Sequence, residues 1–323
     1  MKIKKIDVFP IRVKNDFDQG RKSDTSNINT AMLEIKNLKK TQKSAPKEKK
    51  VEKRNLEPKA LGNYETNIKD MGEYYVDEGS ATSIYSKSHE TTVVKIETDN
   101  GIIGWGEAQS PVSPNTTATI IKDIVEPLTI GKDIYDVESI WHNNYSSKRE
   151  RGHYTGFYID AICGVDIAIW DAIGKSLNMP TCKAMGGAHR KSVALYNGIG
   201  GTEPEEVADQ AEWSVSKGYK FVKMHLKETL EKDIEIARKV RERVGDSIGI
   251  MIDVHMGFDT FNVIKLGKEL EKLNLLWIES PSDPTDIPGL CEISRSLDIP
   301  IANGEWTRTK YEMREIFEKR AYD

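Results

Sequence analysis

The chain has 323 residues, of which 38% are hydrophobic and 30% are charged, and its formal net charge is -4. This composition predicts a globular protein with one large or two ordinary cores, and its near balance of charge gives no support to nucleic-acid binding. No run approaches the roughly 20 apolar residues that span a bilayer, and the cysteines, Cys163, Cys182 and Cys291, stand in dissimilar contexts that suit a reducing cytoplasm better than a disulfide framework.

The N-terminal part of the sequence predicts strands interrupted by a polar insertion. Residues 1–13 (MKIKKIDVFPIRV) alternate apolar and polar side chains like a strand, and they lack the long apolar core and cleavage site of a signal peptide. Residues 15–78, with a lysine-rich stretch at 36–54, have little periodic apolar spacing and predict a mobile loop or disordered insertion, with an interaction tail as the alternative. Order resumes at TTVVKIETDNGIIGWGEA, where Asp-Asn-Gly at 99–101 predicts the turn of a β-hairpin.

Helical spacing follows at 115–128, 134–148 and, most clearly, 157–177, and the pattern changes at Ser192. From there, short apolar strands alternate with amphipathic helices, which indicates a parallel sheet built from βαβ units. The strands read SVALYNGI, KFVKMH, IGIMIDVH, LLWIES and IPIANGE. Because no Gly-rich phosphate loop follows the first of them, a (β/α) barrel with right-handed crossovers is favoured over a dinucleotide-binding sheet.

Acidic residues end three of these predicted strands: Asp253, Glu279 and Glu305. Active sites of such barrels form at the C-terminal ends of the strands, so we expect these carboxylates to converge. Their repulsion, roughly 4 kcal/mol for each pair at an effective dielectric near 20, requires neutralisation. Shared protons with shifted pKa values are one solution, and a hard divalent cation is the other. An all-oxygen set of ligands fits Mg²⁺ better than zinc.

Basic residues accompany the acids on the same strands. Side chains alternate across a strand, so Lys223 and His225 share one face in KMH, and Asp253 and His255 share one face in DVH. These three basic residues are candidates for proton transfer or substrate binding. The structural alternatives are a solvated charge at the barrel rim for Lys223 and hydrogen-bonded histidines at strand ends for the other two.

At these residues the sequence resembles the enolase superfamily, and within it the mandelate racemase/muconate lactonizing enzyme branch, which is rich in acid-sugar dehydratases of the galactonate and mannonate type. The matching pieces are IETDNGIIGWGEA, AICGVDIAIWDAIGKSLNMPTCKAMGG, KMH, DVH, WIESP and ANGE. The resemblance implies an N-terminal capping domain that shapes the substrate pocket and a barrel that carries Mg²⁺ on Asp253, Glu279 and Glu305. It also implies abstraction of the proton α to a carboxylate by a Lys or His base, with Mg²⁺ stabilising the enediolate.

The resemblance also implies roles for the remaining candidates. A histidine two residues after the first metal ligand is similar to that of the sugar-acid dehydratases, so His255 is expected to act as the general acid that expels the β-hydroxyl. Lys223 and His225 are expected to be the base or to bind the substrate carboxylate, and Tyr85 to line the pocket. We therefore expect a Mg²⁺-dependent lyase that converts a small-molecule sugar acid into a 2-keto-3-deoxy acid in the cytoplasm, as a homo-oligomer without nucleic-acid or membrane partners. The alternatives are a racemase, epimerase or cycloisomerase, or an inactive fragment that only binds metal or a partner.

The predicted fold class is α/β, with an N-terminal α+β capping domain over residues 1–150, a helical junction over 151–191 and an incomplete TIM-type (β/α) barrel of about five strands over 192–323. The family's barrel has eight strands, so we expect a C-terminally truncated chain or gene fragment. The later strand that carries a His/Asp pair in relatives has no counterpart here. The polar insertion overlaps the loop that closes over substrate in relatives, so substrate specificity is the property that transfers least.

Overall fold

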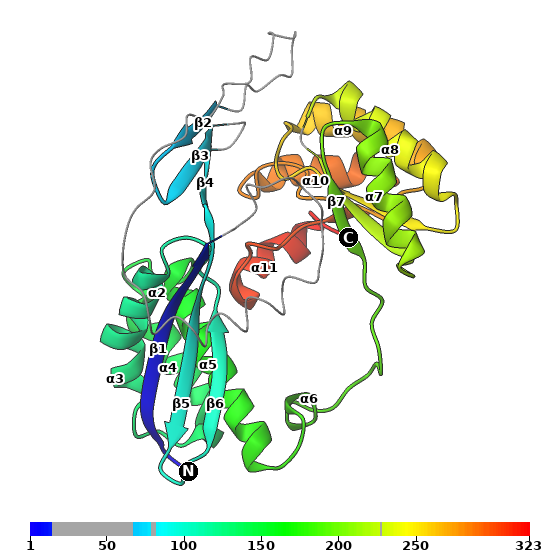
Figure 1. Ribbon diagram of the computed structural model, residues 1–323. Helices are drawn as coiled ribbons and strands as arrows, with labels where there is room; N and C mark the ends of the chain where they lie inside the picture. Colours follow the sequence, from blue (N-terminus) through cyan, green and yellow to red (C-terminus); the bar gives the residue numbers. More distant parts are fainter. Residues whose placement is uncertain (15–66, 79–81, 227) are drawn as a thin grey trace, which may run out of the picture.

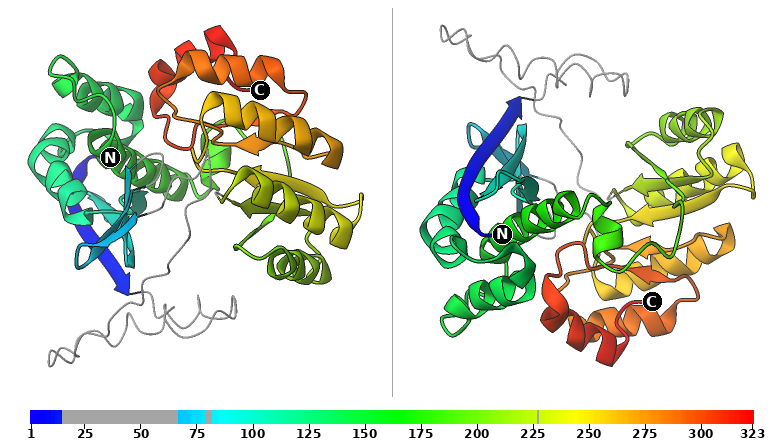
Figure 2. Two further views of the ribbon diagram at one scale, coloured as in Figure 1. Left: turned by 90° about the horizontal axis from the view of Figure 1, so that it is seen from above. Right: turned by 90° about the horizontal axis from the view of Figure 1, so that it is seen from below.

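The structure is a computed structural model that describes residues 1–14, 67–78, 82–226 and 228–323. Its N-terminal and C-terminal parts lie side by side and are linked by the segment that contains the short helix α6, Thr181–Ala184 (Figures 1 and 2). The predicted α/β class is confirmed, since an antiparallel sheet with helices precedes a parallel sheet with helices. No helix within these described ranges is long and apolar enough to cross a membrane.

The N-terminal part contains a three-stranded antiparallel sheet in the order β1-β5-β6. The hairpin of β5 and β6 turns at residues 99–101, as the sequence predicts, and Gly101 has a φ of 85° that glycine adopts without steric cost. Alternate residues of β5 and β6 are buried, so one face of the sheet packs against helices. The strand bounds are β1 Ile3–Lys14, β5 Ser88–Thr98 and β6 Ile103–Ala108.

Helices cover the buried face of this sheet (Figure 1). The three predicted helical stretches are confirmed, although a π-helical turn, η2, interrupts the first. The bounds are α2 Pro114–Ile120, η2 Ile121–Val125, α3 Glu126–Thr129, η3 Ile134–Asp136, α4 Val137–Arg149 and α5 Phe157–Ser176.

Helix α5 approaches β6 so closely that glycine is required between them. A Cβ atom on Gly106 would lie 2.1 Å from the Gly164 carbonyl oxygen, and one on Gly104 would lie 2.0 Å from the Ala168 carbonyl oxygen. The glycines of GIIGWGE therefore serve close packing of strand against helix.

The outer edge of β6 is also engaged by α5. The backbone amide of Trp105 donates to Asp171 Oδ2 at 2.8 Å, and Lys175 Nζ donates to the carbonyl oxygen of Ile103 at 3.0 Å. Asp171 and Lys175 also pair with each other at 2.6 Å. Side chains from the helix thus satisfy backbone groups that an edge strand would otherwise leave open.

A second antiparallel sheet, in the order β2-β3-β4, lies beyond one end of the first, at the top of the N-terminal part in Figure 1. Its strands are β2 Asn67–Asp70, β3 Tyr74–Glu78 and β4 Thr82–Ser86. The predicted insertion over 15–78 is therefore corrected at its C-terminal end, where tyrosine and valine side chains suit strand pairing. The rest of that prediction, residues 15–66, lies outside the described residues.

Glu90 of β5 joins the two sheets. Its side chain is fully buried, and Oε1 accepts hydrogen bonds from Arg12 Nε and Ser86 Oγ, both at 2.7 Å. Oε2 accepts the backbone amide of Ser113 at 3.0 Å. Because a buried carboxylate is stable only when its oxygens are satisfied, this residue fixes the end of β4 against the first sheet.

The C-terminal part is a five-stranded parallel sheet in the order β11-β10-β9-β8-β7, the strand number that the sequence predicts. Its core is a cluster of aliphatic side chains between the sheet and its helices. The strands are β7 Asn197–Gly200, β8 Phe221–His225, β9 Gly249–Asp253, β10 Ile278–Glu279 and β11 Ile301–Ala302. The helices are α7 Pro204–Ser216, α8 Leu230–Val244, α9 Thr260–Leu270, α10 Ile287–Ser296 and α11 Thr309–Lys319, with the short η4 at Glu271–Leu273.

Capping residues fix where these helices begin after the strand ends. Thr229 Oγ1 accepts the amide of Lys232 at 3.2 Å at the start of α8, and Asp259 Oδ1 accepts the amide of Asn262 at 2.8 Å at the start of α9. Such side chains satisfy amides that the first helical turn leaves free. The caps thus fix the first turns of α8 and α9, which follow the strand ends where the candidate residues lie.

Asp233 of α8 carries a fully buried carboxyl group that we expect to make stability depend on pH. Its Oδ1 accepts the amide of Glu228 at 3.2 Å, and its Oδ2 has no partner among the described residues. Burial raises the pKa of Asp233 to about 7. Because the unfolded value is about 3.9, the unfolded chain loses its proton first, and stability falls as the pH rises from about 4 to about 7.

Asp233→Asn should remove this dependence. We expect the variant to gain about 2–3 kcal/mol relative to the wild type between pH 5 and pH 8, since each pKa unit corresponds to about 1.4 kcal/mol. Urea unfolding at the two pH values measures the difference, with Glu235→Gln on the exposed face of the same helix as the control. An Asn variant whose advantage is equal at both pH values would contradict the prediction.

Candidate active site

The carboxyl ends of β8, β9 and β10 bring four predicted site residues together. Strand pairing places His225 beside Asp253 and Asp253 beside Glu279. Lys223 Nζ lies 2.9 Å from Glu279 Oε1 and 3.4 Å from Asp253 Oδ2. His225 Nδ1 lies 3.4 Å from the same oxygen of Asp253. Lys223 and Asp253 are buried, so their charges interact more strongly than they would in bulk water.

The surroundings keep Lys223 and Asp253 in their charged forms. Burial by itself would raise the pKa of Asp253, but hydrogen bonds from His225 and from the backbone amide of His255, with the charge of Lys223, hold it below its ordinary value. Burial would lower the pKa of Lys223, but the hydrogen bond and charge of Glu279, with the charge of Asp253, raise it. The site is therefore an ammonium group that neutralises two adjacent carboxylates.

Tyr85 reaches this site from the second sheet. Its hydroxyl lies 2.8 Å from His255 Nε2, and the two rings are 6.4 Å apart. The backbone amide of His255 in turn donates to Asp253 Oδ1 at 2.9 Å. Tyr85, predicted to line the pocket, and His255, predicted to be the general acid, thus form a direct pair beside the carboxylates. The sequence did not indicate this contact.

The backbone is strained where β9 and β10 end. His255, Met256 and Ser280 have φ values of 44°, 59° and 47°, in the left-handed region that non-glycine residues rarely adopt. Each such residue costs roughly 1 kcal/mol or more, and strain of this kind clusters at functional sites. His255, which hydrogen-bonds to Tyr85, is one of these residues.

Glu305 is not aligned in register with the other two acids. It is exposed in the loop after β11, whereas Asp253 and Glu279 end their strands in register. Throughout the part of the chain that the structure describes, no three His, Cys, Asp or Glu side chains group closely enough to hold a metal ion. The structure brings Asp253 and Glu279 together, and the role of Glu305 as a third ligand stays a prediction.

Two aromatic residues that the sequence analysis did not single out complete the site. Trp277 Nε1 donates to Glu279 Oε2 at 3.2 Å, and the Tyr196 ring lies 5.3 Å from Lys223 Nζ in a cation–π contact. The two rings meet edge to face at 6.4 Å. Trp277 could have been found by strand alternation, since it lies two residues before Glu279 and so shares its face.

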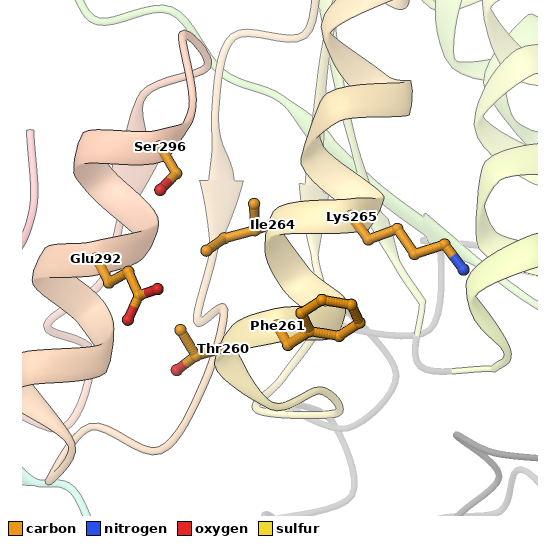
Figure 3. A pocket seen from close by; sticks show the side chains of 6 residues that line it. All are labelled: Thr260, Phe261, Ile264, Lys265, Glu292 and Ser296. Atoms are coloured by element: carbon orange, nitrogen blue, oxygen red, sulfur yellow. The ribbon is translucent and has the colours of Figure 1, made fainter.

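A pocket between α9 and α10 does not coincide with this chemistry (Figure 3). It is lined by Thr260, Phe261, Ile264, Lys265, Glu292 and Ser296. None of the predicted site residues lines it, and it opens in the outer layer of helices. The strand ends, where charged groups meet, are therefore the candidate active site.

A parallel sheet with acids and bases at its carboxyl ends, joined to an α+β domain, defines an architecture of the (β/α)-barrel enzyme class. Residues 77–186 match the N-terminal domain of the mandelate racemase/muconate lactonizing enzyme family, and residues 206–323 match the enolase C-terminal domain-like family. Arabinonate dehydratase of Saccharolobus solfataricus is 30% identical over 269 residues, which cover 79% of this chain and 72% of that protein. The chain belongs to the mandelate racemase/muconate lactonizing enzyme family of the enolase superfamily, as its motifs predict.

Other relatives carry different activities. The N-succinyl-L-Arg/Lys racemase of Bacillus cereus is 31% identical over 72% of this chain and 62% of its own length. The D-galactarolactone cycloisomerase of Agrobacterium fabrum is 29% identical over 72% of this chain and 61% of its own length. A crystal structure from Sinorhizobium meliloti has a TM-score of 0.80 at 28% identity and covers 100% of this chain and 73% of that one. The chain thus spans less than two thirds of two relatives, and family membership alone does not select one reaction.

Proposed function

We propose that the protein is a Mg²⁺-dependent sugar-acid dehydratase, a lyase. It abstracts the proton α to a carboxylate and eliminates the β-hydroxyl as water, which gives a 2-keto-3-deoxy acid. The observation that carries this proposal is the grouping of Lys223, Asp253 and Glu279 with the pair of His255 and Tyr85 beside them. Two relatives support it by name: arabinonate dehydratase, and the L-talarate/galactarate dehydratase of Salmonella typhimurium, which is 32% identical over 62% of this chain and 51% of its own length.

Two of the three carboxylates that we propose as Mg²⁺ ligands, Asp253 and Glu279, are neighbours in register, and the ammonium of Lys223 pairs with both of them. Mg²⁺ would be held by Asp253, Glu279 and Glu305, whose carboxylate oxygens are the ligands that Mg²⁺ prefers. When bound, it would stabilise the negative charge that develops on the substrate carboxylate.

We assign substrate binding and proton transfer to the three basic residues of the site. Lys223, held as an ammonium group, is suited to binding the substrate carboxylate and not to removing a proton. His225 is exposed beside Asp253 and is therefore the base that we assign to the α proton. His255, hydrogen-bonded to Tyr85 through Nε2, is assigned as the acid that protonates the leaving hydroxyl. General acid–base catalysis of this kind supplies about 10²–10⁴-fold in rate.

The same proposal covers the organisation of the chain. We assign residues 1–150 as a cap that contributes Tyr85 to the pocket, 151–191 as the junction and 192–323 as barrel units. The free state of all three cysteines supports the reducing cytoplasm as the location. A homo-oligomeric state remains a prediction, which light scattering during size-exclusion chromatography would check.

The 323-residue protein should release 2-keto-3-deoxy acids from at least one member of a panel of aldonic and aldaric acids in the presence of Mg²⁺. Colorimetric detection of the keto acid measures this. His255→Asn should lower dehydration by about 10²–10⁴-fold yet retain exchange of the α proton with deuterated water, since the base is unchanged. Absence of both turnover and exchange across the panel would contradict the proposed function.

The second candidate is a racemase, epimerase or cycloisomerase, which the racemase and cycloisomerase relatives favour. Exchange of the α proton without loss of water, in the wild type, would select it. Binding of Mg²⁺ with neither exchange nor turnover would select a third reading, a metal-binding protein without catalysis.

A further inference from the structure

The second sheet, β2-β3-β4, carries a contact between the N-terminal part of the chain and the candidate active site. Tyr85 of β4 places its hydroxyl 2.8 Å from His255 Nε2. Tyr75 of β3 is the cross-strand partner of Tyr85, and the two rings stack at 5.3 Å with an angle of 23° between their planes. A pair of aromatic residues thus meets His255, and the geometry of this contact depends on how the second sheet is held.

A buried carboxylate holds the neighbouring cross-strand pair of the same two strands. Tyr74 and Ser86 are partners in register, and both donate to Glu90 of β5. Ser86 Oγ donates to Oε1 at 2.7 Å, and the Tyr74 hydroxyl donates to Oε2 at 3.3 Å. Consecutive residues of a strand lie about 3.3 Å apart and point to opposite faces. The carboxylate therefore grips one face of β3 and β4, while Tyr75 and Tyr85 lie on the other face.

Residues outside the second sheet fix Glu90 itself. Arg12 Nε of β1 donates to Oε1 at 2.7 Å, and the backbone amide of Ser113, which precedes α2, donates to Oε2 at 3.0 Å. The Glu90 side chain is fully buried, and β4 passes into β5 through a single residue, Lys87. Each carboxylate oxygen thus accepts one hydrogen bond from the second sheet and one from outside it.

We propose that Glu90 is a positioning residue for the candidate active site: it holds the second sheet so that the Tyr85 hydroxyl stays within reach of His255. The effect on rate rests on the proposed function, in which His255 protonates the leaving hydroxyl. The contact itself does not depend on that function.

The carboxylate is needed because four donors converge on Glu90, two on each oxygen. A glutamine at this position has one oxygen and one NH₂ group, so in either orientation the NH₂ group faces two donors. These buried donors would then lack an acceptor, which is unfavourable. We therefore expect Glu90→Gln to release the second sheet from its position against His255.

The ring signal of His255 in ¹H–¹³C NMR spectra of the 323-residue protein, at one fixed pH, tests the contact. The chain has six histidines, so His255→Asn identifies the signal. Tyr85→Phe should shift it, because the hydroxyl beside Nε2 is lost. Glu90→Gln should shift it in the same direction. Combined with Tyr85→Phe, it should add no further shift, because both substitutions act through one contact.

Glu73→Gln is the matched control. Glu73 pairs with Nη1 of the same Arg12 at 3.2 Å, but its side chain is 59% exposed, so the substitution should leave the His255 signal in place. Ser86→Ala removes one of the four donors and keeps the carboxylate. It should shift the signal in the same direction as Glu90→Gln by a smaller amount, and it serves as the test if circular dichroism shows that Glu90→Gln does not fold.

Kinetics supply the second measurement, on the sugar acid that the wild type dehydrates. Glu90→Gln should lower kcat for dehydration by about 10–100-fold, the scale on which a misplacement of about 1 Å acts, and should leave α-proton exchange in deuterated water within about 3-fold. An equal loss of dehydration and exchange would assign Glu90 a structural role and overturn the proposal.

The NMR outcomes separate this inference from the proposed function. An unshifted His255 signal in Glu90→Gln and Ser86→Ala, or an equal shift in Glu73→Gln, would overturn the role of Glu90 whatever the enzyme catalyses. A wild type that neither dehydrates nor exchanges any acid of the panel would overturn the proposed function and the effect on rate. The His255 signal would then still decide whether Glu90 holds the contact.

Discussion

Asp253→Asn should weaken Mg²⁺ binding by at least about 100-fold and lower α-proton exchange by about 10³-fold, the scale on which removal of one electrostatic stabiliser acts. Asp253 is 4% exposed and accepts hydrogen bonds from Lys223 and from the amide of His255, while His225 lies 3.4 Å away. An amide of the same shape removes the negative charge and leaves Lys223 with Glu279 alone. Calorimetry with MgCl₂ and mass spectrometry of substrate in deuterated water measure the two effects.

Asp246→Asn is the matched control, because Asp246 is exposed near the opposite end of β9. It should leave both quantities within about 2-fold, as expected for a surface change remote from the site. An Asp253→Asn variant that binds Mg²⁺ as tightly as the wild type would remove Asp253 from the proposed metal site.

Gly106→Val should destabilise the N-terminal part by about 5 kcal/mol, at the upper limit for single substitutions. A Cβ at this position would lie 2.1 Å from the Gly164 carbonyl oxygen and 2.7 Å from the Ala168 amide nitrogen. Both are backbone atoms of α5 and cannot rotate away, so the helix would have to leave the sheet. Ordinary overpacking costs about 1–3 kcal/mol because side chains can adjust. Urea unfolding followed by circular dichroism measures the loss.

Glu107→Val places the same side chain on the opposite, exposed face of β6. It should change stability by about 1 kcal/mol or less, since valine suits a strand and the hydrogen bond that it removes, from Thr91 Oγ1 at 2.6 Å, is exposed. Equal stability of the two variants would show that α5 and β6 can separate at little cost.

The sequence predicted those helices, strands and turns whose signals lie within a short stretch of residues. The 99–101 hairpin, the helix at 157–177 and the five strands after Ser192 all follow from turn chemistry and periodicity. The sequence did not predict β2 and β3, because two strands of four and five residues give little periodic signal and pair only with each other and with β4. Nor did it predict the π-helical turn, which has no known compositional signal here.

The candidate site was predicted where residues share a strand or adjacent strands. Asp253 and Glu279 meet because parallel register aligns their strand ends. Contacts between distant parts of the chain left no trace in local spacing: Tyr85 and His255 are separated by 170 residues, and Arg308 and Asp160 by 148. Glu305 was placed by analogy with the other strand ends, whereas it lies in the loop beyond the end of β11 at Ala302.

The hydrogen bonds from Asp171 and Lys175 to the edge strand β6 bear on the tendency of the protein to aggregate in a concentrated solution. Ile103 and Trp105 expose apolar side chains on this strand. An exposed edge strand with such side chains ordinarily tends to pair with a strand of another chain. Here two main-chain groups of the edge, the amide of Trp105 and the carbonyl oxygen of Ile103, already bond to side chains of the protein's own helix α5. The apolar side chains of this strand can therefore stay exposed with less risk that further chains add to the sheet by strand pairing.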